Sequence, residues 1–275
     1  MAVINTNVAA TLTANALAQN ERASTQALER LSTGLRINSA ADDAAGMAMS
    51  NTMTAQVKGL DMAVKNANDA ISMIQTADGA SIEIGDMLQR MRELAVQANN
   101  GTLTDADRTQ LNLEFQQLET EITRVGAQTE WNGTALLAGT IGTTGTVTYQ
   151  IGDTAQTMDV AFGTLTAVGD LGLDATGTIA TATGAAAAIT DLDAAIVALN
   201  TQRATYGAAI NRLEHTVDNL SNVSMNTQSA LSRIQDADYA TESTALAKTQ
   251  IIAQAGTAML AQANQQAQTV LALLK

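Results

Sequence analysis

Only a few residues in this 275-residue chain are of types that could perform catalysis or bind a metal. His215 is the only histidine and there is no cysteine, so a zinc-protease helix, which needs two histidines four residues apart, cannot be built. A serine-protease triad would have to use His215 on a charged helix. The carboxylate pairs Asp42-Asp43 and Asp105/Asp107 are typical of helix caps and surface charge rather than acid–base catalysis. The sequence therefore predicts no enzyme activity, no cofactor and no metal site.

The composition favours packed helices over a globular enzyme. Hydrophobic residues make up 46% of the chain but aromatic residues only 2%, and proline is absent. Aromatic side chains dominate most cores and pockets, whereas small alanines suit close helix packing. The net charge is −13, and no Lys or Arg occurs from Val125 to Gln202. Such an acidic chain repels nucleic acids and anionic membranes, so neither is predicted as a partner.

The first 24 residues contain neither a basic start nor a continuous apolar stretch. They therefore do not resemble a cleaved secretory signal peptide. The chain also lacks the run of roughly 18 apolar residues that a membrane-spanning helix needs. The sequence predicts either a cytoplasmic protein or one that leaves the cell without a standard signal.

Two segments near opposite ends of the chain repeat apolar residues at alternating steps of three and four. This heptad spacing predicts long helices that pack as in a coiled coil. Polar Ser224 and Thr227 interrupt the second segment, where they would cost stability but fix the register. The predicted core positions are Val57, Leu60, Val64, Ile71, Ile74, Ile210, Leu213, Val217, Leu220, Leu231 and Ile234.

The helix beyond Asp236 has a much thinner apolar stripe. Its large apolar residues include Leu246, Ile252, Met259 and Leu273, which are widely spaced with Ala and Gln between them. An isolated helix of this kind is marginal in water. Both ends of the chain are therefore expected to need partners to become ordered.

Turn signals divide the rest of the chain. Asn99-Asn100-Gly101 predicts a helix end, and Thr104 with Asp107 predicts a capping box at the start of the next helix. Asn132-Gly133 is typical of a hairpin turn. Alternating residues at 146–151 and 158–162 predict short strands in a Gly- and Thr-rich middle. The fold class is thus mainly α: a long, antiparallel, coiled-coil-like helical bundle formed by both chain ends, with a small β-hairpin and a short β-rich central insert.

Several long motifs closely resemble bacterial flagellins. They are RLSTGLRINSAADDAAGMAMS at 30–50, LQRMRELAVQANNGTLT at 88–104, QTEWNGTALLAG at 128–139, and a block from 207 to 251 that begins GAAINRLEHTVDNL. The resemblance covers roughly 1–139 and 190–275. It implies a structural subunit that polymerises into the helical flagellar filament for swimming. A hook–filament junction protein of the same structural class is the alternative.

The resemblance also implies a domain organisation. Residues 1–40 and 236–275 would form an inner terminal-helix domain that lines the filament channel, and 41–139 with 190–235 would form a rod-like helical domain. Residues 140–189 would be a variable, surface-exposed insert. An enzymatic or sugar-binding insert is a third possibility, but between 140 and 190 there is no histidine, one tyrosine and one phenylalanine. The threonines of the insert are candidates for O-glycosylation or simply turn and strand residues.

Partners and localisation follow from the same resemblance. The chain would form a homopolymer, leave the cell through the flagellar export apparatus without a cleaved signal peptide, and become extracellular. A cytoplasmic export chaperone would bind the C-terminal helix at Leu246, Ile252, Met259 and Leu273, as an amphipathic helix binds in a groove. Filament-cap and hook-junction proteins would be further partners.

The segment from 88 to 104 has two interpretations. Structurally, Leu88, Met91 and Leu94 would cover a core or a neighbouring subunit. By resemblance, the same segment is recognised by the flagellin-sensing Toll-like receptor. The predicted receptor epitope consists of Gln89, Arg90, Leu94 and Glu114.

Overall fold

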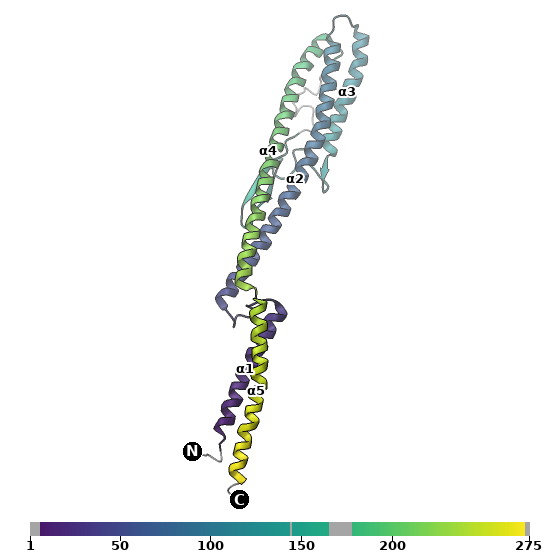
Figure 1. Cartoon of the computed structure of the whole chain (residues 1–275). Helices are drawn as coiled ribbons and strands as arrows, with labels where there is room; N and C mark the ends of the chain where they lie inside the picture. The colour runs from purple at the N-terminus through teal and green to yellow at the C-terminus, as the bar shows by residue number, and fades with distance from the viewer. Residues whose placement is uncertain (1–5, 144, 165–177, 273–275) are drawn as a thin grey trace. The chain divides into compact units, whose positions relative to one another are not determined.

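The computed structural model describes residues 6–143, 145–164 and 178–272, and of residues 266–272 only the backbone. Five helices dominate the chain (Figure 1). Their bounds are α1 Val8–Thr33, α2 Ala44–Ala98, α3 Asp105–Gln128, α4 Ala182–Gln235 and α5 Tyr239–Ala272. The mainly α fold predicted from the sequence is therefore confirmed.

Two small antiparallel hairpins complete the described elements. The first pairs β1 (Glu130–Trp131) with β2 (Thr134–Ala135), and the second pairs β3 (Thr146–Gln150) with β4 (Thr157–Ala161). In the first turn, both Asn132 (φ 51°) and Gly133 (φ 77°) are left-handed. This is the geometry that makes Asn-Gly the preferred pair for a two-residue hairpin turn.

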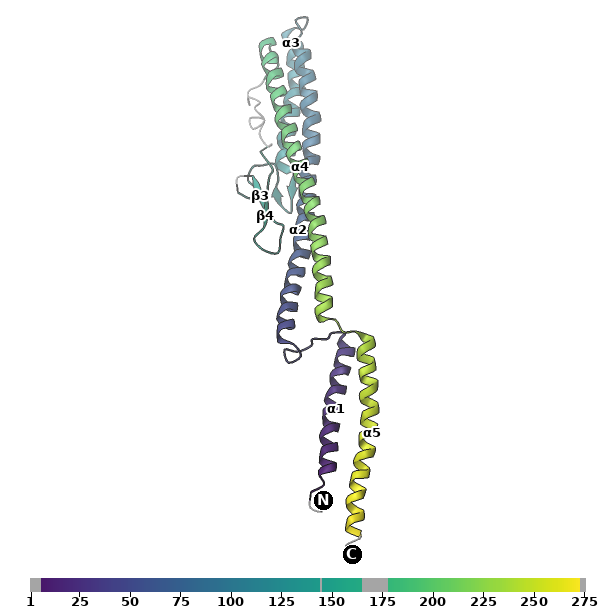
Figure 2. The ribbon, with the colours of Figure 1, turned by 60° about the vertical axis from the view of Figure 1, so that its left-hand side comes forward.

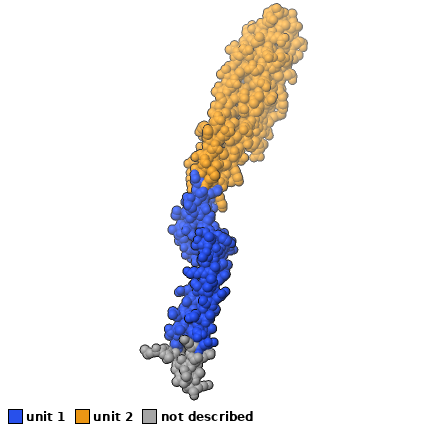
Figure 3. Space-filling view, in the orientation of Figure 1, with its two compact units in different colours: residues 1–55, 226–275 blue, residues 56–225 orange. Residues whose placement is uncertain are grey.

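The chain divides into two compact units, coloured blue and orange in Figure 3. Residues 1–55 and 226–275 form one, which we call the terminal unit, and residues 56–225 form the other, which we call the central unit. Both hydrophobic clusters lie in the central unit. The apolar core of the described protein is therefore concentrated between residues 60 and 220.

In the central unit, α2 and α4 run side by side in opposite directions, with α3 against α2 (Figures 1 and 2). Polar contacts fix their register. Arg92 Nε donates to Asp193 Oδ1 at 2.6 Å, and Arg203 Nε to Asp78 Oδ1 at 2.9 Å. Further along, Ser224 Oγ donates to Asp61 Oδ1 at 2.9 Å. A buried serine at a heptad position thus has a polar partner on the facing helix, as a register-fixing residue requires.

The β3–β4 hairpin packs along α2. The hairpin approaches α2 at residues 73, 66 and 59, which are spaced seven residues apart. The Tyr149 hydroxyl donates to the sulfur of Met73 at 2.9 Å, and Asn66 Nδ2 donates to the Gln150 carbonyl at 3.1 Å. At Gly59, an added Cβ would lie 3.0 Å from the Cβ of Asp153. A glycine is therefore needed where the hairpin loop approaches the helix most closely.

The residue that follows β4, Phe162, packs against α4. Tyr206 and Phe162 are both fully buried, and their ring centroids lie 5.9 Å apart. The Tyr206 hydroxyl donates to the Phe162 carbonyl at 2.5 Å. Met158 and Val160 of β4 are buried in the same large cluster. One face of the β3–β4 hairpin, within the predicted insert, is thus part of the main core.

Two tyrosines, half-buried Tyr149 and fully buried Tyr206, predict how stability should change at alkaline pH. Burial raises the pKa of both Tyr149 and Tyr206 to about 12, from an ordinary value near 10. Between these values the unfolded chain releases protons that the folded chain keeps, so the free energy of unfolding should fall as pH rises. Urea midpoints should fall from about pH 10 to pH 12, and less steeply in Tyr206→Phe. Equal slopes in both proteins would contradict this prediction.

Candidate assembly surfaces

In the terminal unit, polar contacts join α1 and α5, which lie side by side in both views (Figures 1 and 2). Asn7 Nδ2 donates to the Ala263 carbonyl at 3.0 Å, and Asn20 Nδ2 donates to the Thr249 carbonyl at 2.7 Å. Near the other end of α1, Arg30 Nη1 and Glu242 Oε1 form an ion pair at 3.0 Å. These contacts align the two helices.

Large apolar side chains remain exposed on the terminal unit. Among its described apolar residues, only Ala27 and Ile37 are buried. Leu12 is 71% exposed, Ile251 66% and Met259 60%. The remaining exposed large apolar residues here are Val8, Leu28, Met49, Tyr239 and Ile252. The central unit also exposes large apolar side chains, but only the terminal unit combines them with so few buried apolar residues among those described.

The two connections between helices in this unit pair with each other. Leu35 and Asp236 form an isolated antiparallel bridge. Arg36 N donates to the Gln235 carbonyl at 2.7 Å, and Ala237 N donates to the Gly34 carbonyl at 2.9 Å. The connection from α1 to α2 is thereby tied to the connection from α4 to α5.

The carboxylates singled out in the sequence act as caps. Asp42 accepts from Ser39 N at 3.0 Å, and hydrogen bonds led by this one lower its pKa. Asp43 Oδ1 accepts from Gly46 N at 2.9 Å at the start of α2. The predicted capping box between Thr104 and Asp107 is present at the start of α3. These acids therefore serve local structure.

The predicted C-terminal positions occupy different environments. Leu246 is half-buried, whereas Ile252 and Met259 are exposed. Leu273 lies outside the described residues. Their proposed role in binding a chaperone stays a prediction.

The predicted heptad positions line the helices as follows. Buried positions are Val57, Leu60, Ile74, Leu213 and Leu220. Half-buried positions are Val64, Ile71, Ile210, Val217, Leu231 and Ile234.

The structure brings three of the four predicted epitope residues to one surface. Gln89 and Arg90 are exposed on α2, and Glu114 is exposed on α3. Arg90 Nη2 pairs with Glu114 at 2.8 Å and Arg90 Nη1 with Glu93 at 2.9 Å. Leu94 is only 1% exposed, inside the main cluster. The exposed surface therefore does not include Leu94, which belongs to the main cluster.

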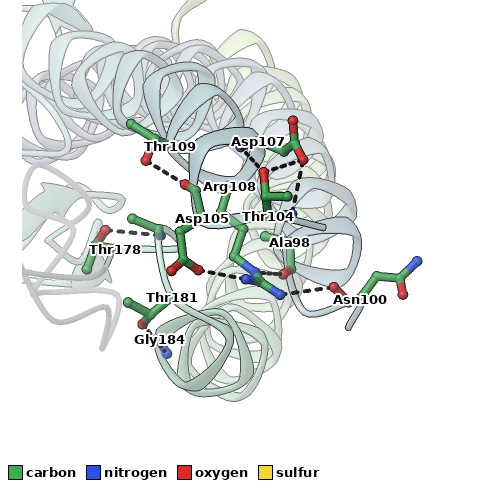
Figure 4. A network of polar contacts seen from close by, with 11 residues as sticks. Ala98, Asn100, Thr104, Asp105, Asp107, Arg108, Thr109, Thr178, Thr181 and Gly184 are labelled. Atoms are coloured by element: carbon green, nitrogen blue, oxygen red, sulfur yellow. Dashed lines mark hydrogen bonds and ion pairs between the residues drawn. The ribbon is translucent and has the colours of Figure 1, made fainter. Parts of the chain in front are cut away.

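Arg108 is a structural residue that the sequence did not reveal. It is 7% exposed and reaches from α3 to the end of α2 (Figure 4). Its Nε donates to the Ala98 carbonyl at 2.9 Å and its Nη2 to the Asn100 carbonyl at 3.1 Å. Its Nη1 pairs with Asp105 at 2.8 Å. A buried guanidinium thus satisfies the Ala98 carbonyl at the end of α2, and it is a second donor to the Asn100 carbonyl, which also accepts from Leu103 N at 3.3 Å.

Replacing Arg108 with alanine should destabilise the central unit by about 2–4 kcal/mol, because its charged hydrogen bonds are lost and the Ala98 carbonyl is left without its donor. Urea unfolding followed by circular dichroism would measure the change. Arg124→Ala is a matched control, since Arg124 is an exposed α3 arginine whose ion pair with Glu121 spans one helical turn. That control should change stability by at most about 0.5 kcal/mol. Equal effects of the two substitutions would contradict this structural role of Arg108.

Among the described residues, side chains that could bind a metal are not gathered into a site. His215 is exposed on α4. Across the described ranges, no three His, Cys, Asp or Glu side chains are placed to hold a metal ion.

Among the described helices, α4 alone is long and apolar enough to cross a membrane by those two criteria. Much of its apolarity comes from alanine, and Leu192 and Leu199 pack in the main cluster.

Comparison with known proteins agrees with this architecture. The family described as the bacterial flagellin N-terminal helical region matches residues 4–141, and the bacterial flagellin C-terminal helical region matches residues 189–274. A flagellin of Halalkalibacterium halodurans is 46% identical over 99% of this chain and 100% of its own length. A flagellin of Bacillus subtilis is 44% identical over 99% of each chain.

One solved structure resembles this chain in fold but has little sequence identity to it. It comes from Vibrio parahaemolyticus and is assigned provisionally as a flagellar hook-associated protein. The two chains are 15% identical with a TM-score of 0.60, over 71% of this chain and 100% of the other.

The two family regions leave 142–188 and a few terminal residues (1–3 and 275) uncovered, and the relatives align over nearly their whole length. The chain therefore belongs to the bacterial flagellin family, and it is a structural subunit of the extracellular filament used for motility, not an enzyme.

Proposed function

We propose that copies of this chain polymerise through the terminal unit, whose exposed apolar side chains become covered by other copies. The observation that carries the proposal is the contrast between the two units. The central unit has a continuous buried core, whereas the described part of the terminal unit buries only Ala27 and Ile37 among its apolar residues. Contacts that do not close into a ring produce an open helical polymer.

The same contrast supports a restraint on early assembly. In dilute monomer, residues 1–40 and 236–275 would be disordered, because ordering them costs entropy that only neighbouring copies offset. In the filament they would form the inner domain around the channel. Residues 41–139 and 190–235 would surround them, with 140–189 outermost.

Seeded assembly tests this function. Purified protein is mixed with short filament seeds, or with a precipitating salt, and imaged by electron microscopy. Long uniform filaments with a central channel are expected. Persistent monomer beside intact seeds would count against self-polymerisation.

A hook–filament junction protein is the second candidate. The fold shared with the Vibrio parahaemolyticus protein favours it, because that protein's own description places it at the hook. A junction protein would add a short, self-limiting layer instead of extending seeds without limit, so the lengths measured in the same images separate the two candidates.

Export and its partners form a further part of the proposal. The subunit would be exported without a cleaved signal peptide, with a cytoplasmic chaperone on α5 around Leu246, Ile252, Met259 and Leu273. Exposure of Ile252 and Met259 supports this, since both are available to a groove. Cap and hook-junction proteins would meet the subunit after export.

Recognition by the flagellin-sensing Toll-like receptor would use Gln89, Arg90 and Glu114, supported by buried Leu94. The exposed Arg90–Glu114 pair supports this because it presents both charges on one surface. Arg90→Ala should reduce the response in a receptor reporter assay, whereas Arg124→Ala should not. An unchanged response to the Arg90 variant would refute the mapping.

A further inference from the structure

Two copies of the same tripeptide occur in very different structural settings. Asn100-Gly101-Thr102 follows the end of α2, and Asn132-Gly133-Thr134 spans the β1–β2 turn. Asn-Gly pairs can form a succinimide, because glycine leaves its amide nitrogen open to attack the asparagine side chain. Since the tripeptides are identical, a large difference in their reactivity would come from the fold.

The structure activates the side chain of Asn100. Its Oδ1 accepts a hydrogen bond from Thr102 N at 3.2 Å. This contact folds the side chain back over the Gly101 amide, as asparagine does when it bonds to the backbone two residues on. The same N–H points at the oxygen on which negative charge develops during attack at Cγ, so it stabilises that charge.

Arg108 acts on the other reactant. Its Nη2 donates to the backbone carbonyl of Asn100 at 3.1 Å. That carbonyl belongs to the peptide bond whose nitrogen is Gly101 N, so a guanidinium bonded to it makes the Gly101 N–H more acidic. No neighbouring atom lies within 4 Å of where a Gly101 Cβ would be, and both residues are exposed. Space for ring closure is therefore available.

Asn132 lacks these contacts. The described part of the chain contains no hydrogen-bond partner for its side chain, and its backbone is held left-handed within a hairpin turn. Trp131 and Thr134, which are paired across the two strands, close that turn directly. Ring closure there would have to distort the hairpin.

We propose that Asn100 is a spontaneous deamidation site, activated by Thr102 N–H and Arg108, and that Asn132 is a protected one. Hydroxide removes the Gly101 N–H proton and the nitrogen bonds to Asn100 Cγ. The Cγ–Nδ2 bond then breaks as Nδ2 takes a proton from water and leaves as ammonia, which regenerates hydroxide. Water then opens the succinimide at either carbonyl, giving aspartate or isoaspartate. Each event adds one negative charge, and isoaspartate also lengthens the backbone by one carbon where Arg108 holds the end of α2.

The test is ageing of full-length protein at mildly alkaline pH, followed by proteolysis and mass spectrometry of the two peptides. Asn100 should deamidate about tenfold or more faster than Asn132 in the folded protein, the effect expected of one hydrogen bond to the developing charge. In denaturant the two rates should converge, because the tripeptides are the same. Equal rates in the folded protein, or a faster Asn132, would overturn the proposal.

A variant separates activation from simple exposure. Arg108→Lys keeps the positive charge but loses the fork of donors, so it should lower the Asn100 rate while Asn132 is unchanged. Circular dichroism establishes that the variant is folded. If the folded variant deamidates at Asn100 as fast as the original protein, Arg108 has no part in the reaction. If it does not fold, the folded-to-denatured comparison in the original protein decides the proposal.

Discussion

Changing Leu12, Ile251 and Met259 together to glutamine is expected to abolish polymerisation and leave the central unit folded. Each of the three side chains is mostly exposed on α1 or α5. Covering a side chain of this size stabilises a contact by about 1.5–3 kcal/mol, and every subunit in a polymer would lose all three contributions. Glutamine is a good helix former, so helix propensity is little changed. Sedimentation and electron microscopy of seeded samples would measure the loss.

The matched control keeps the same positions apolar. Leu12→Met, Ile251→Leu and Met259→Leu conserve volume closely, and swaps of this kind are well tolerated. This control should still form filaments. Normal filaments from the glutamine variant would contradict the account, as would failure of both variants to assemble.

Phe162→Ala is expected to destabilise the whole central unit by about 3–5 kcal/mol, the usual cost of truncating a fully buried phenylalanine. Phe162 is fully buried against Tyr206, and its amide donates to the Gly145 carbonyl at 2.8 Å. Urea unfolding followed by helix circular dichroism should show a single earlier transition.

Val197→Ala is the control for this substitution, because Val197 is exposed on α4. It should change stability by at most about 0.5 kcal/mol. If the hairpin were an independent appendage, Phe162→Ala would leave the helical transition where it is. An unchanged transition would therefore show that the hairpin does not belong to the core.

Local signals predicted much of this fold. Heptad spacing around Leu60 and Leu213 predicted the packed helices, Thr104 with Asp107 predicted the start of α3, and Asn132-Gly133 predicted a turn. Each of these patterns acts over a few residues, so its physical meaning is contained in the sequence around it.

Contacts between distant residues could not be predicted in this way. The alternation around Met158 and Val160 predicted strands, but it could not show that these side chains enter the main cluster. Arg108 resembles an ordinary helix-surface arginine paired with Asp105, and only the fold places the end of α2 beside it. Leu94 likewise could be assigned to a core or to an outer surface until its burial was known.

Hydrogen–deuterium exchange of the same protein as dilute monomer and as assembled polymer tests most directly whether other copies complete the terminal unit. The account predicts rapid exchange in α1 and α5 in the monomer, strong protection there in the polymer, and protection of α2 and α4 between residues 60 and 220 in both. Protection of α1 and α5 in the monomer equal to that in the polymer would contradict it, because the terminal unit would then be stable without neighbours.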